Sequence, residues 1–585
     1  MNSKVYQTHI IYFIIISIIG LLIYLPSLTG NFVYDDNETI VKNPYIKNLT
    51  FIPQYFDPSH SDMWSVHRQQ RGLYRPLLLA SFALNYHISG LNPFSYHLFN
   101  ILLHILNSLM VYIIINSVLL SLGESEKDKH RNMRIAFASA LLFVCHPVQT
   151  ESVSYIVSRS SLLATFFILC SFLFFLYSVK TERSRRTFRI TSIMCFVLGL
   201  LTKEIVIVLP MIVLLYAALH FYYKKEKQIL LASIRISIPY FIILFLYLLF
   251  RILSVDKSYF SAAERIFITY FLTSMKAVFI YLKVLFYPLD LNVDHHLPII
   301  NTIWDPSALL AFFSILLYYS ISSPLFFRYS KALFLFSLWF IIALMPNMFI
   351  PTSEPISEHT IYFPSIGFFA VGMILVMKFW YHLKLHTVKE MRAVGLAFFY
   401  ALIMVMGIMT LDRNHTWQED ISLWSDAVKK SPNHERPHLN LGLAYMGINR
   451  PDLAFHEFQS ILAMNPNNSS AMNNIGIIWG NVNNFEKAKE AFTNSIKMKA
   501  DNPDTLNNLG FLYIQFSKYE KSIPILKKVI EINPNDFTAH TNLGLAYCQM
   551  SDYTRGCYYL QNAMKINPDY KRGVQLYQQL CVKNK

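Results

Sequence analysis

The chain has 585 residues, of which 54% are hydrophobic and 15% are charged, and its formal net charge is +15. A soluble protein of this length carries about a quarter charged residues, so the composition excludes a chain that is soluble throughout. Residues 412–585 hold 19 Lys/Arg against 16 Asp/Glu, which leaves about +12 of the +15 in residues 1–411. This positive charge lies in short loops between apolar segments, which is typical of a membrane topology and argues against a nucleic-acid partner.

The apolar segments of residues 1–411 predict a polytopic membrane domain, because a spanning helix needs about twenty apolar residues. We expect about eleven spans, at 10–26, 96–120, 134–150, 157–179, 189–202, 204–222, 232–253, 307–326, 331–350, 362–381 and 393–411. The first is followed by Pro-Ser-Leu-Thr-Gly rather than by a small-residue cleavage site. We therefore interpret it as a retained span and not as a signal peptide.

The basic loops predict the topology. They are Lys180–Arg189, Lys224–Lys227, Arg328–Lys331 and Lys384–Arg392. If these loops are cytoplasmic, the N-terminus is cytoplasmic, the long first loop 27–95 is external, and everything after Asp412 is periplasmic or luminal. If residues 268–287 were counted as a span, the Arg328–Lys331 loop would fall on the external side, against this topology. Because Lys276 and Lys283 share a helix face, we expect an amphipathic helix on the outer leaflet there.

A period of 34 residues begins after the last span. Gly442, Gly476, Gly510 and Gly544 each follow Leu or Ile and precede an aromatic residue by three positions. A proline holds the same period at Pro432, Pro466, Pro534 and Pro568. This is the tetratricopeptide signature. It predicts a coupling half-repeat helix in 412–434 and an α-solenoid in 435–585, with repeats 435–468, 469–502, 503–536 and 537–570 and a C-terminal cap.

The predicted fold class is therefore all-α, a membrane domain (1–411) followed by a repeat solenoid that offers a concave surface to a protein or peptide. The six cysteines show no CxxC or other metal-ligand spacing. We expect neither a disulfide framework nor a metal site.

Ionisable residues beside spans are the informative positions of a membrane protein. On the expected external side they are Asp35, Asp36, Arg75, His146, Glu151, Arg159, Lys203, Glu204, Asp294, His295, His296, Glu358 and His359, with Tyr362 nearby. Each has a structural alternative: the Asp-Asp pair as a solvated turn, Arg75 as an interfacial anchor, Lys203 and Glu204 as a local ion pair. Their gathering on one side favours a site, because a carboxylate can accept a proton from a hydroxyl and Arg and Lys can bind a phosphate.

The chain resembles the transmembrane and tetratricopeptide-repeat protein O-mannosyltransferases and their bacterial relatives, which have the GT-C glycosyltransferase fold. The motifs FVYDDNETI, YRPL, YHLFNILLHILN, HPVQTESVSYIVSRSSLLA, LTKE and WQEDISLWSDAV carry the resemblance. It implies a sugar donor linked to polyprenyl phosphate, mannose or another hexose as the sugar, and transfer to protein hydroxyls on the non-cytoplasmic face. It also implies that the repeats bind the acceptor protein. We expect the chain in a bacterial inner membrane or an endoplasmic reticulum membrane, and we expect neither a further cofactor nor a metal.

The resemblance implies a role for each motif residue. Asp35 and Asp36 would be catalytic, with Asp35 as the base, and the donor phosphate would be bound by Arg75, Arg159, Lys203 and His359. Relatives commonly have Arg where this chain has His359, and an imidazole binds phosphate fully only when it is protonated. Further candidate site residues are His146, Glu151, Glu204, Glu358 and Tyr362.

Two other functions compete with a glycosyltransferase. A non-catalytic membrane-anchored repeat scaffold would have no use for Asp35, Asp36 and Arg75 in a long first loop. A transporter would place ionisable residues deep in its spans and divide into two related halves, and we find no internal duplication in residues 1–411.

Overall fold

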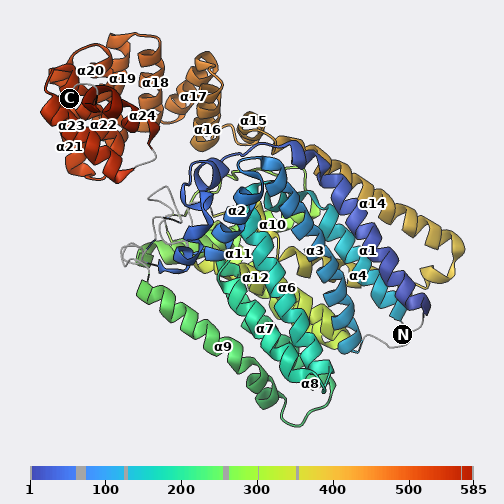
Figure 1. The fold of residues 1–585 in the computed structure, drawn as a ribbon. Helices are drawn as coiled ribbons and strands as arrows, with labels where there is room; N and C mark the ends of the chain where they lie inside the picture. Colours follow the sequence, from blue (N-terminus) through green and yellow to red (C-terminus); the bar gives the residue numbers. More distant parts are fainter. Residues whose placement is uncertain are drawn as a thin grey trace. The chain divides into compact units, whose positions relative to one another are not determined.

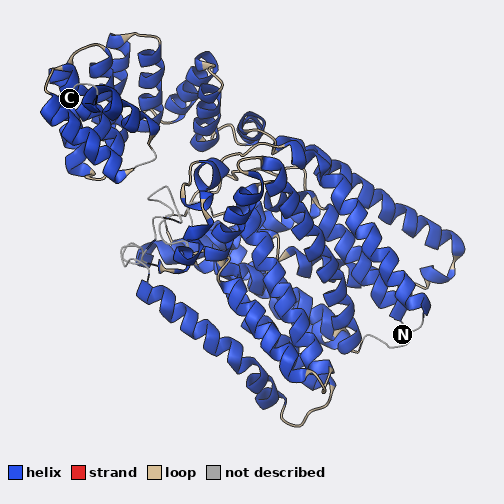
Figure 2. Cartoon of the chain, in the orientation of Figure 1, coloured by secondary structure: helices blue, strands red, loops and turns tan. Residues whose placement is uncertain are grey.

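The computed structural model describes residues 3–58, 60, 63, 74–123, 129–254, 263–300, 302–350, 355–567 and 570–582. These residues form helices joined by loops, and none of them lies in a β-strand (Figure 2). The chain divides into two compact units, Met1–Asp426 and Ala427–Lys585, each of which is described by itself.

The first unit is a bundle of long apolar helices, coloured blue to yellow-brown in Figure 1. Among the described residues, ten helices are long and apolar enough to span a membrane, or eleven if the bent pair Lys129–Cys145 and Pro147–Val153 is one span. The chain is thus a multi-pass membrane protein. The helices are α1 (Ser3–Tyr24), α2 (Pro76–Ser89), α3 (Pro93–Ser121), α4 (Lys129–Cys145), α5 (Thr150–Val153), α6 (Arg159–Lys180), α7 (Arg185–Leu200), α8 (Leu209–Tyr223), α9 (Ile229–Ser254), α10 (Ala263–Phe286), α11 (Pro306–Tyr329), α12 (Lys331–Phe349), α13 (Ser365–His382), α14 (Lys389–Thr416) and α15 (Asp420–Lys430).

Several helices face outward with apolar side chains. In α9 and α11 only 22% and 11% of the most apolar stretch of the helix is buried within the protein. Phe245 and Leu253 of α9 and Leu310 of α11 are 65%, 76% and 70% exposed. Leaving such a side chain in water costs about 1.5–3 kcal/mol relative to burial. These faces are therefore stable only against lipid.

One end of the bundle collects the loops that matter for function. Asn347 in the last turn of α12, Lys203 after α7 and Ser161 in the first turn of α6 line one cavity. Glu151, which follows α4, is hydrogen-bonded to His359 of the same cavity. We call this end of the bundle the site end. The four basic loops join α6 to α7, α8 to α9, α11 to α12 and α13 to α14 at the opposite end (Figure 1).

Ten of the eleven predicted spans coincide with a candidate span or with the bent pair. The remaining one, predicted at 189–202, is α7. Its 16 residues cover only about 24 Å, which is less than the hydrocarbon thickness. It nevertheless runs back along α6, because Lys203 beyond its end donates a hydrogen bond to Ser161 at the start of α6.

Helix α10 corresponds to residues 268–287, which we expected to lie on the outer leaflet. Its residues 267–286 count among the ten candidate spans by length and composition. A residue near each end of α10 contacts a segment at the site end of the bundle. Phe267 stacks on Phe349, the last residue of α12, and the Leu285 carbonyl accepts a hydrogen bond from His146, directly after α4. These contacts favour a helix that lies across the site end.

The second unit is a solenoid of helix pairs. The pairs are α16 (Glu435–Gly447) with α17 (Pro451–Met464), α18 (Ser469–Asn481) with α19 (Phe485–Met498), α20 (Pro503–Gln515) with α21 (Tyr519–Ile532), and α22 (Phe537–Gln549) with α23 (Tyr553–Ile566), followed by α24 (Lys571–Tyr577). A Cβ atom on Gly442 would lie 2.5 Å from the Phe458 ring, and one on Gly476 2.6 Å from the Phe492 ring. The recurring glycine is therefore required by the close approach of the paired helices. Pro568 lies outside the described residues.

A disulfide closes the end of the solenoid, contrary to the expectation from cysteine spacing. Cys557 of α23 bonds to Cys581 beyond α24, with the two Cα atoms 5.7 Å apart. The cysteines are 24 residues apart and meet only because α24 folds back onto α23, which spacing alone does not reveal. The buried Cys548 thiol lies within 4.8 Å of both sulfurs.

Candidate functional site

Cations from three separate segments meet around one carboxylate at the site end. Arg75 Nη2 donates to Glu204 Oε2 at 2.8 Å, and Arg251 Nη2 lies 3.8 Å from Glu204 Oε1. Lys203 Nζ donates to Ser161 Oγ at 2.7 Å. Burial, and then the nearby Arg75, lower the pKa of Lys203 to about 7. Arg75 and Arg251 thus share Glu204, and Lys203 lies close enough for its charge to interact with those of Arg75 and Glu204. Three cations near one carboxylate leave an excess positive charge that suits a bound anion.

Two histidine–glutamate pairs lie beside this cluster. His359 Nδ1 and Glu151 Oε1 share a hydrogen bond at 2.6 Å, and the His359 backbone N–H donates to Glu151 Oε2 at 3.2 Å. Burial, Lys203 and Arg75 hold the pKa of His359 well below its usual range. At neutral pH, His359 is therefore uncharged and hydrogen-bonded to Glu151. His295 Nε2 donates to Glu358 Oε1 at 2.9 Å.

The environment of Glu358 is unusual. Oε1 also accepts a hydrogen bond from the Asn292 backbone N–H at 2.6 Å, while Oε2 is buried without a hydrogen-bond partner. The carboxyl lies in a fully enclosed position. A buried oxygen with no donor is costly. A bound group that donates a hydrogen bond to Glu358 Oε2 would remove this cost.

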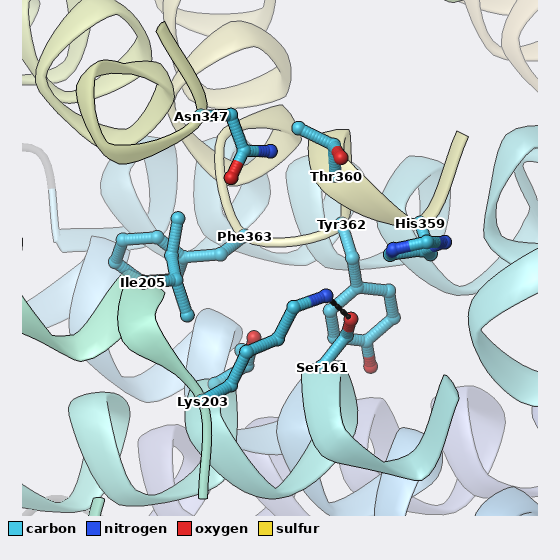
Figure 3. Close-up of a pocket in the computed structure, with 9 residues that line it drawn as sticks. Ser161, Lys203, Ile205, Asn347, His359, Thr360, Tyr362 and Phe363 are labelled. Carbon is cyan, nitrogen blue, oxygen red and sulfur yellow. Dashed lines mark hydrogen bonds between the residues drawn. The ribbon is translucent and has the colours of Figure 1, made fainter. Parts of the chain in front are cut away.

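A small cavity lies between Lys203 and His359 (Figure 3). It is lined by Ser161, Thr165, Lys203, Ile205, Asn347, His359, Thr360, Tyr362 and Phe363. In the close-up the Lys203 ammonium reaches toward Ser161, Asn347 and Thr360 lie on the opposite side, and Ile205 and Phe363 close one flank. The cavity therefore combines one cation and several hydrogen-bonding groups with an apolar wall.

The acidic pair of the first loop follows a residue in an unfavourable backbone conformation. Tyr34 has φ of 54°, in the left-handed region that bulky residues rarely adopt. Its N–H donates to Asp420 Oδ1 at 2.8 Å, and its ring packs on Tyr155 at 5.8 Å and Trp424 at 5.2 Å. The segment after the last span thus holds the turn that presents Asp35. Such strain is retained mainly where a site requires it.

Asp35 and Asp36 have different environments. Asp36 is fully buried, and its two carboxyl oxygens accept hydrogen bonds from the backbone N–H groups of Val33 at 3.2 Å and Val157 at 2.8 Å. Burial raises the pKa of Asp36 well above its usual range, although these two bonds oppose the shift. Asp35 is only half-buried. Asp36 therefore anchors the loop, and Asp35 is the more accessible carboxylate.

The acidic loop and the cationic cluster both attach to the start of α6. Asp36 bonds to Val157 and Lys203 bonds to Ser161. Val157 lies in the short 3₁₀ turn Ile156–Ser158 directly before α6 and Ser161 in the first turn of α6, so the two attachment points are four residues apart in the sequence. The fold thus brings a base candidate and a phosphate-binding candidate into one neighbourhood, although their motifs are far apart in the sequence.

Arg159, a predicted phosphate ligand, is enclosed by protein. Nε donates to Asn100 Oδ1 at 2.8 Å, Nη1 to Asn85 Oδ1 at 2.5 Å, and Nη2 to the Tyr96 carbonyl at 3.1 Å. The Phe82 ring lies 4.7 Å from the guanidinium carbon. Because the residue is 0% exposed, we assign Arg159 to joining α2, α3 and α6 and leave it out of the phosphate site.

His146 and Tyr362 also join helices. His146 Nε2 donates to the Leu285 carbonyl at 3.1 Å, and its Nδ1 accepts a hydrogen bond from the Val148 N–H at 3.3 Å. The Tyr362 hydroxyl is hydrogen-bonded to His104 Nδ1 at 2.7 Å. Both side chains therefore hold segments of the site end together, and Tyr362 also lines the cavity.

Arg251 is a member of the cluster that the sequence analysis did not select. It occupies the last turn of α9, where a positive charge interrupts an apolar run. That interruption is a usable signal, since charges at the ends of spans are commonly functional. His295 was listed only as an ionisable residue of the expected external side, and its bond to Glu358 follows from tertiary structure.

Comparison with known proteins agrees with these motifs. Tetratricopeptide-repeat family models match residues 503–536 and 525–558. The chain is 27% identical to protein O-mannosyl-transferase F38B6.6 of Caenorhabditis elegans over 434 residues, 72% of this chain and 58% of that protein. It is 32% identical to protein O-mannosyl-transferase TMTC1 of Mus musculus over 217 residues, 35% of this chain and 22% of that protein.

A third relative is protein O-mannosyl-transferase TMTC2 of Homo sapiens, 33% identical over 220 residues, 37% of this chain and 25% of that protein. The matches thus span between about a quarter and less than two thirds of these relatives' own lengths. They confirm the resemblance inferred from the sequence motifs, and the family models confirm the repeat solenoid.

Proposed function

We propose that this protein is a GT-C-type membrane glycosyltransferase that transfers mannose or another hexose from polyprenyl phosphate to hydroxyl groups of proteins. The observation that carries the proposal is the cationic cluster of Arg75, Lys203 and Arg251, beside an acidic loop held in a strained turn. The similarity to protein O-mannosyl-transferases supports the same reaction.

The cationic cluster binds the donor phosphate. Lys203 immediately precedes the span Glu204–Tyr223, and Arg251 lies in the last turn of the span Ile229–Ser254. Cations at the ends of spans lie at the level of lipid head groups, where the phosphate of a membrane lipid is found. The outward apolar side chains of α9, such as Phe245 and Leu253, offer a surface along which a polyprenyl chain can lie.

Asp35 acts as the general base. It accepts the proton of the acceptor hydroxyl as the hydroxyl oxygen attacks the anomeric carbon, and the bond from that carbon to the phosphate oxygen breaks. The polyprenyl phosphate leaves with the additional negative charge, which Arg75, Lys203 and Arg251 stabilise. Asp36 positions Asp35 through its bonds to Val33 and Val157.

The titration of Lys203 gives the reaction a pH dependence. The pKa of Lys203 lies near 7 in the free protein, so its ammonium is charged below that pH and neutral above it. Because the charged form binds phosphate, kcat/KM for the lipid donor should fall as pH rises from about 6 to about 8.5, since this ratio reports the free enzyme. In Lys203→Arg the guanidinium stays charged, and this step should disappear. A wild-type profile that is flat or rises through pH 7 would contradict the assignment.

The site end and the repeats belong to the non-cytoplasmic side. In the described residues the chain crosses eleven times when α7 is counted and α10 is not, an odd number that separates the two termini. The four basic loops lie at the opposite end of the bundle and favour a cytoplasmic position. The Cys557–Cys581 disulfide is of a kind that persists in oxidising compartments.

A reporter fused after the last residue should therefore behave as periplasmic or luminal. A large maleimide should label Cys557 and Cys581 in denatured samples from cells only after reduction, whereas the Cys581→Ser variant should expose Cys557 without reduction. A cytoplasmic reporter together with free Cys557 and Cys581 thiols in the unreduced wild type would place the repeats on the other side and separate the proposed site from its acceptor.

A further inference from the structure

An apolar groove lies on the outer surface of the bundle, near the end that carries the basic loops. It is lined by Leu325, Phe326, Arg328 and Tyr329 of α11, Leu333 of α12 and Leu375 of α13, and we call it the α11–α13 groove. Its volume of about 420 Å³ falls within the range of small-molecule sites. Among the residues that the structure describes, it shares no lining residue with the cavity of the site end. It is therefore a separate place where a ligand can bind.

Apolar and cationic side chains follow one another along two helices of the groove. Arg328 comes three residues after Leu325 on α11, and Lys378 comes three residues after Leu375 on α13. Residues three apart lie on the same face of a helix. Both helices lead into a basic loop at their C-terminal ends. On each helix, the cation therefore lies about one turn nearer to the basic loops than the leucine does.

The apolar part of the groove is open to the acyl chains of the membrane. Leu325 is 57% exposed and Leu375 is 39% exposed, whereas Leu333 is fully buried and closes the groove on its inner side. Only 11% of the most apolar stretch of α11 is buried within the protein, so this helix faces lipid. An acyl chain can therefore enter the groove and cover the two exposed leucines.

Two cations lie at the end of the groove that is nearer to the basic loops. The Arg328 side chain is exposed, and across the described ranges it makes no hydrogen bond and no ion pair. Lys378 reaches from α13 to α11, where its Nζ donates to the Tyr329 carbonyl at 3.3 Å and lies 4.5 Å from the centre of the Tyr329 ring. No carboxylate is among the described residues that line the groove. The lining side chains therefore do not neutralise this positive charge.

A phospholipid matches both parts of the groove. Its phosphate is an anion and its acyl chains are apolar, in the same order as the cations and leucines along α11 and α13. A free phosphate would leave the apolar part empty, and a lipid without net charge would gain less from the two cations. Positive charge in cytoplasmic loops also sets the topology, but that role requires no groove. Basic pockets between spans on the cytoplasmic side are suited to anionic head groups.

We propose that the α11–α13 groove binds an anionic phospholipid of the surrounding leaflet. Arg328 and Lys378 bind the phosphate, and an acyl chain lies along Leu325, Leu333 and Leu375. The groove lies at the opposite end of the bundle from the site end, so this lipid is not the sugar donor. Its binding does not rest on the proposed function.

The test is a titration of the full-length protein in detergent, read out by native mass spectrometry. The probes are phosphatidylglycerol and phosphatidylcholine with identical acyl chains, and the Kd of the first bound lipid is compared between them. The wild type should prefer phosphatidylglycerol about tenfold or more, because two cations act on its net negative charge. Arg328→Gln should reduce this preference about fivefold, and Arg328→Gln/Lys378→Gln should abolish most of it. Equal affinity of the wild type for the two lipids, or an unchanged preference in both variants, would overturn the proposal.

A matched control removes the same charge from another basic loop. Arg183 and Arg186 are exposed residues of the loop between α6 and α7 and do not line the groove. Arg183→Gln/Arg186→Gln should therefore keep the preference of the wild type. A loss as large as that of Arg328→Gln/Lys378→Gln would show that positive charge anywhere on this side attracts the lipid, and the groove would have no special role.

Two further measurements separate a phospholipid from a soluble anion. Leu375→Trp keeps both cations but fills the apolar part of the groove with a larger side chain, so phosphatidylglycerol should bind about tenfold more weakly. The compound sn-glycerol 3-phosphate, which has the phosphate without acyl chains, should not displace the lipid at the same concentration. Unchanged binding by Leu375→Trp would rule out an acyl chain in the groove. Displacement by sn-glycerol 3-phosphate would identify a soluble-phosphate site instead, and either result would overturn the proposal.

Discussion

Asp35→Asn is expected to lower the rate of sugar transfer by about 10²–10⁴-fold, the usual cost of losing a general base, while the protein stays folded. Asparagine has nearly the same shape as aspartate and is equally suited to a turn, but its amide cannot accept the acceptor proton. The assay is transfer from a polyprenyl-phosphate hexose to an acceptor peptide, with thermal stability measured in parallel.

Asp36→Asn is the matched comparison and should fail in a different way. Both oxygens of Asp36 accept backbone hydrogen bonds, and an amide nitrogen in place of one oxygen would face a donor. A buried donor left unsatisfied costs about 1–3 kcal/mol, so this variant should lose thermal stability as well as activity. If Asp35→Asn retains near-wild-type turnover, the first-loop carboxylate is a structural turn and not the base.

Arg75→Gln is expected to reduce kcat/KM for the lipid donor by about 10–100-fold, because a hydrogen bond to a charged group contributes about 1.5–3 kcal/mol. Arg251→Gln should have a smaller effect in the same direction, since Arg251 lies further from Glu204, at 3.8 Å against 2.8 Å for Arg75. The effect should fall on donor kinetics and leave peptide binding unchanged.

The control for these substitutions is Arg235→Gln, an exposed arginine on α9 remote from the cluster at the other end of that helix. It should leave donor kinetics unchanged. An equal loss in Arg235→Gln would mean that general positive charge near the membrane, and not the cluster, attracts the donor. Unchanged kinetics in both Arg75→Gln and Arg251→Gln would show that the cluster does not bind the donor phosphate.

Periodic and compositional features could be predicted from the sequence alone. The 34-residue period predicted the helix pairs because each signature glycine serves a local contact, such as that of Gly442 with Phe458. Apolar runs predicted most spans for a similar reason, since length and hydropathy decide them locally. Helix α10 shows the limit, because composition makes it a candidate span while its contacts at Phe267 and Leu285 belong to one end of the bundle.

Roles that depend on three-dimensional surroundings could not be predicted. Arg75 and Arg159 look alike in the sequence, yet Arg159 is enclosed by Asn85, Asn100 and Tyr96. His359 is bonded to Glu151, a partner that lies 208 residues away in the sequence. Arg251 joins the cluster only through the packing of α9 toward Glu204.

The proposed function requires that the site use a hexose carried on polyprenyl phosphate, and one transfer assay decides this. Purified full-length protein and the Asp35→Asn variant are given radiolabelled polyprenyl-phosphate mannose, and in parallel other polyprenyl-phosphate hexoses and a nucleotide-linked mannose, with a Ser/Thr-containing acceptor peptide. Under the proposed mechanism, the wild type should label the peptide from a lipid-linked donor, and the Asp35→Asn variant should label it at least about a hundredfold more slowly. Labelling only from the nucleotide sugar, or equal labelling by both proteins, would contradict it.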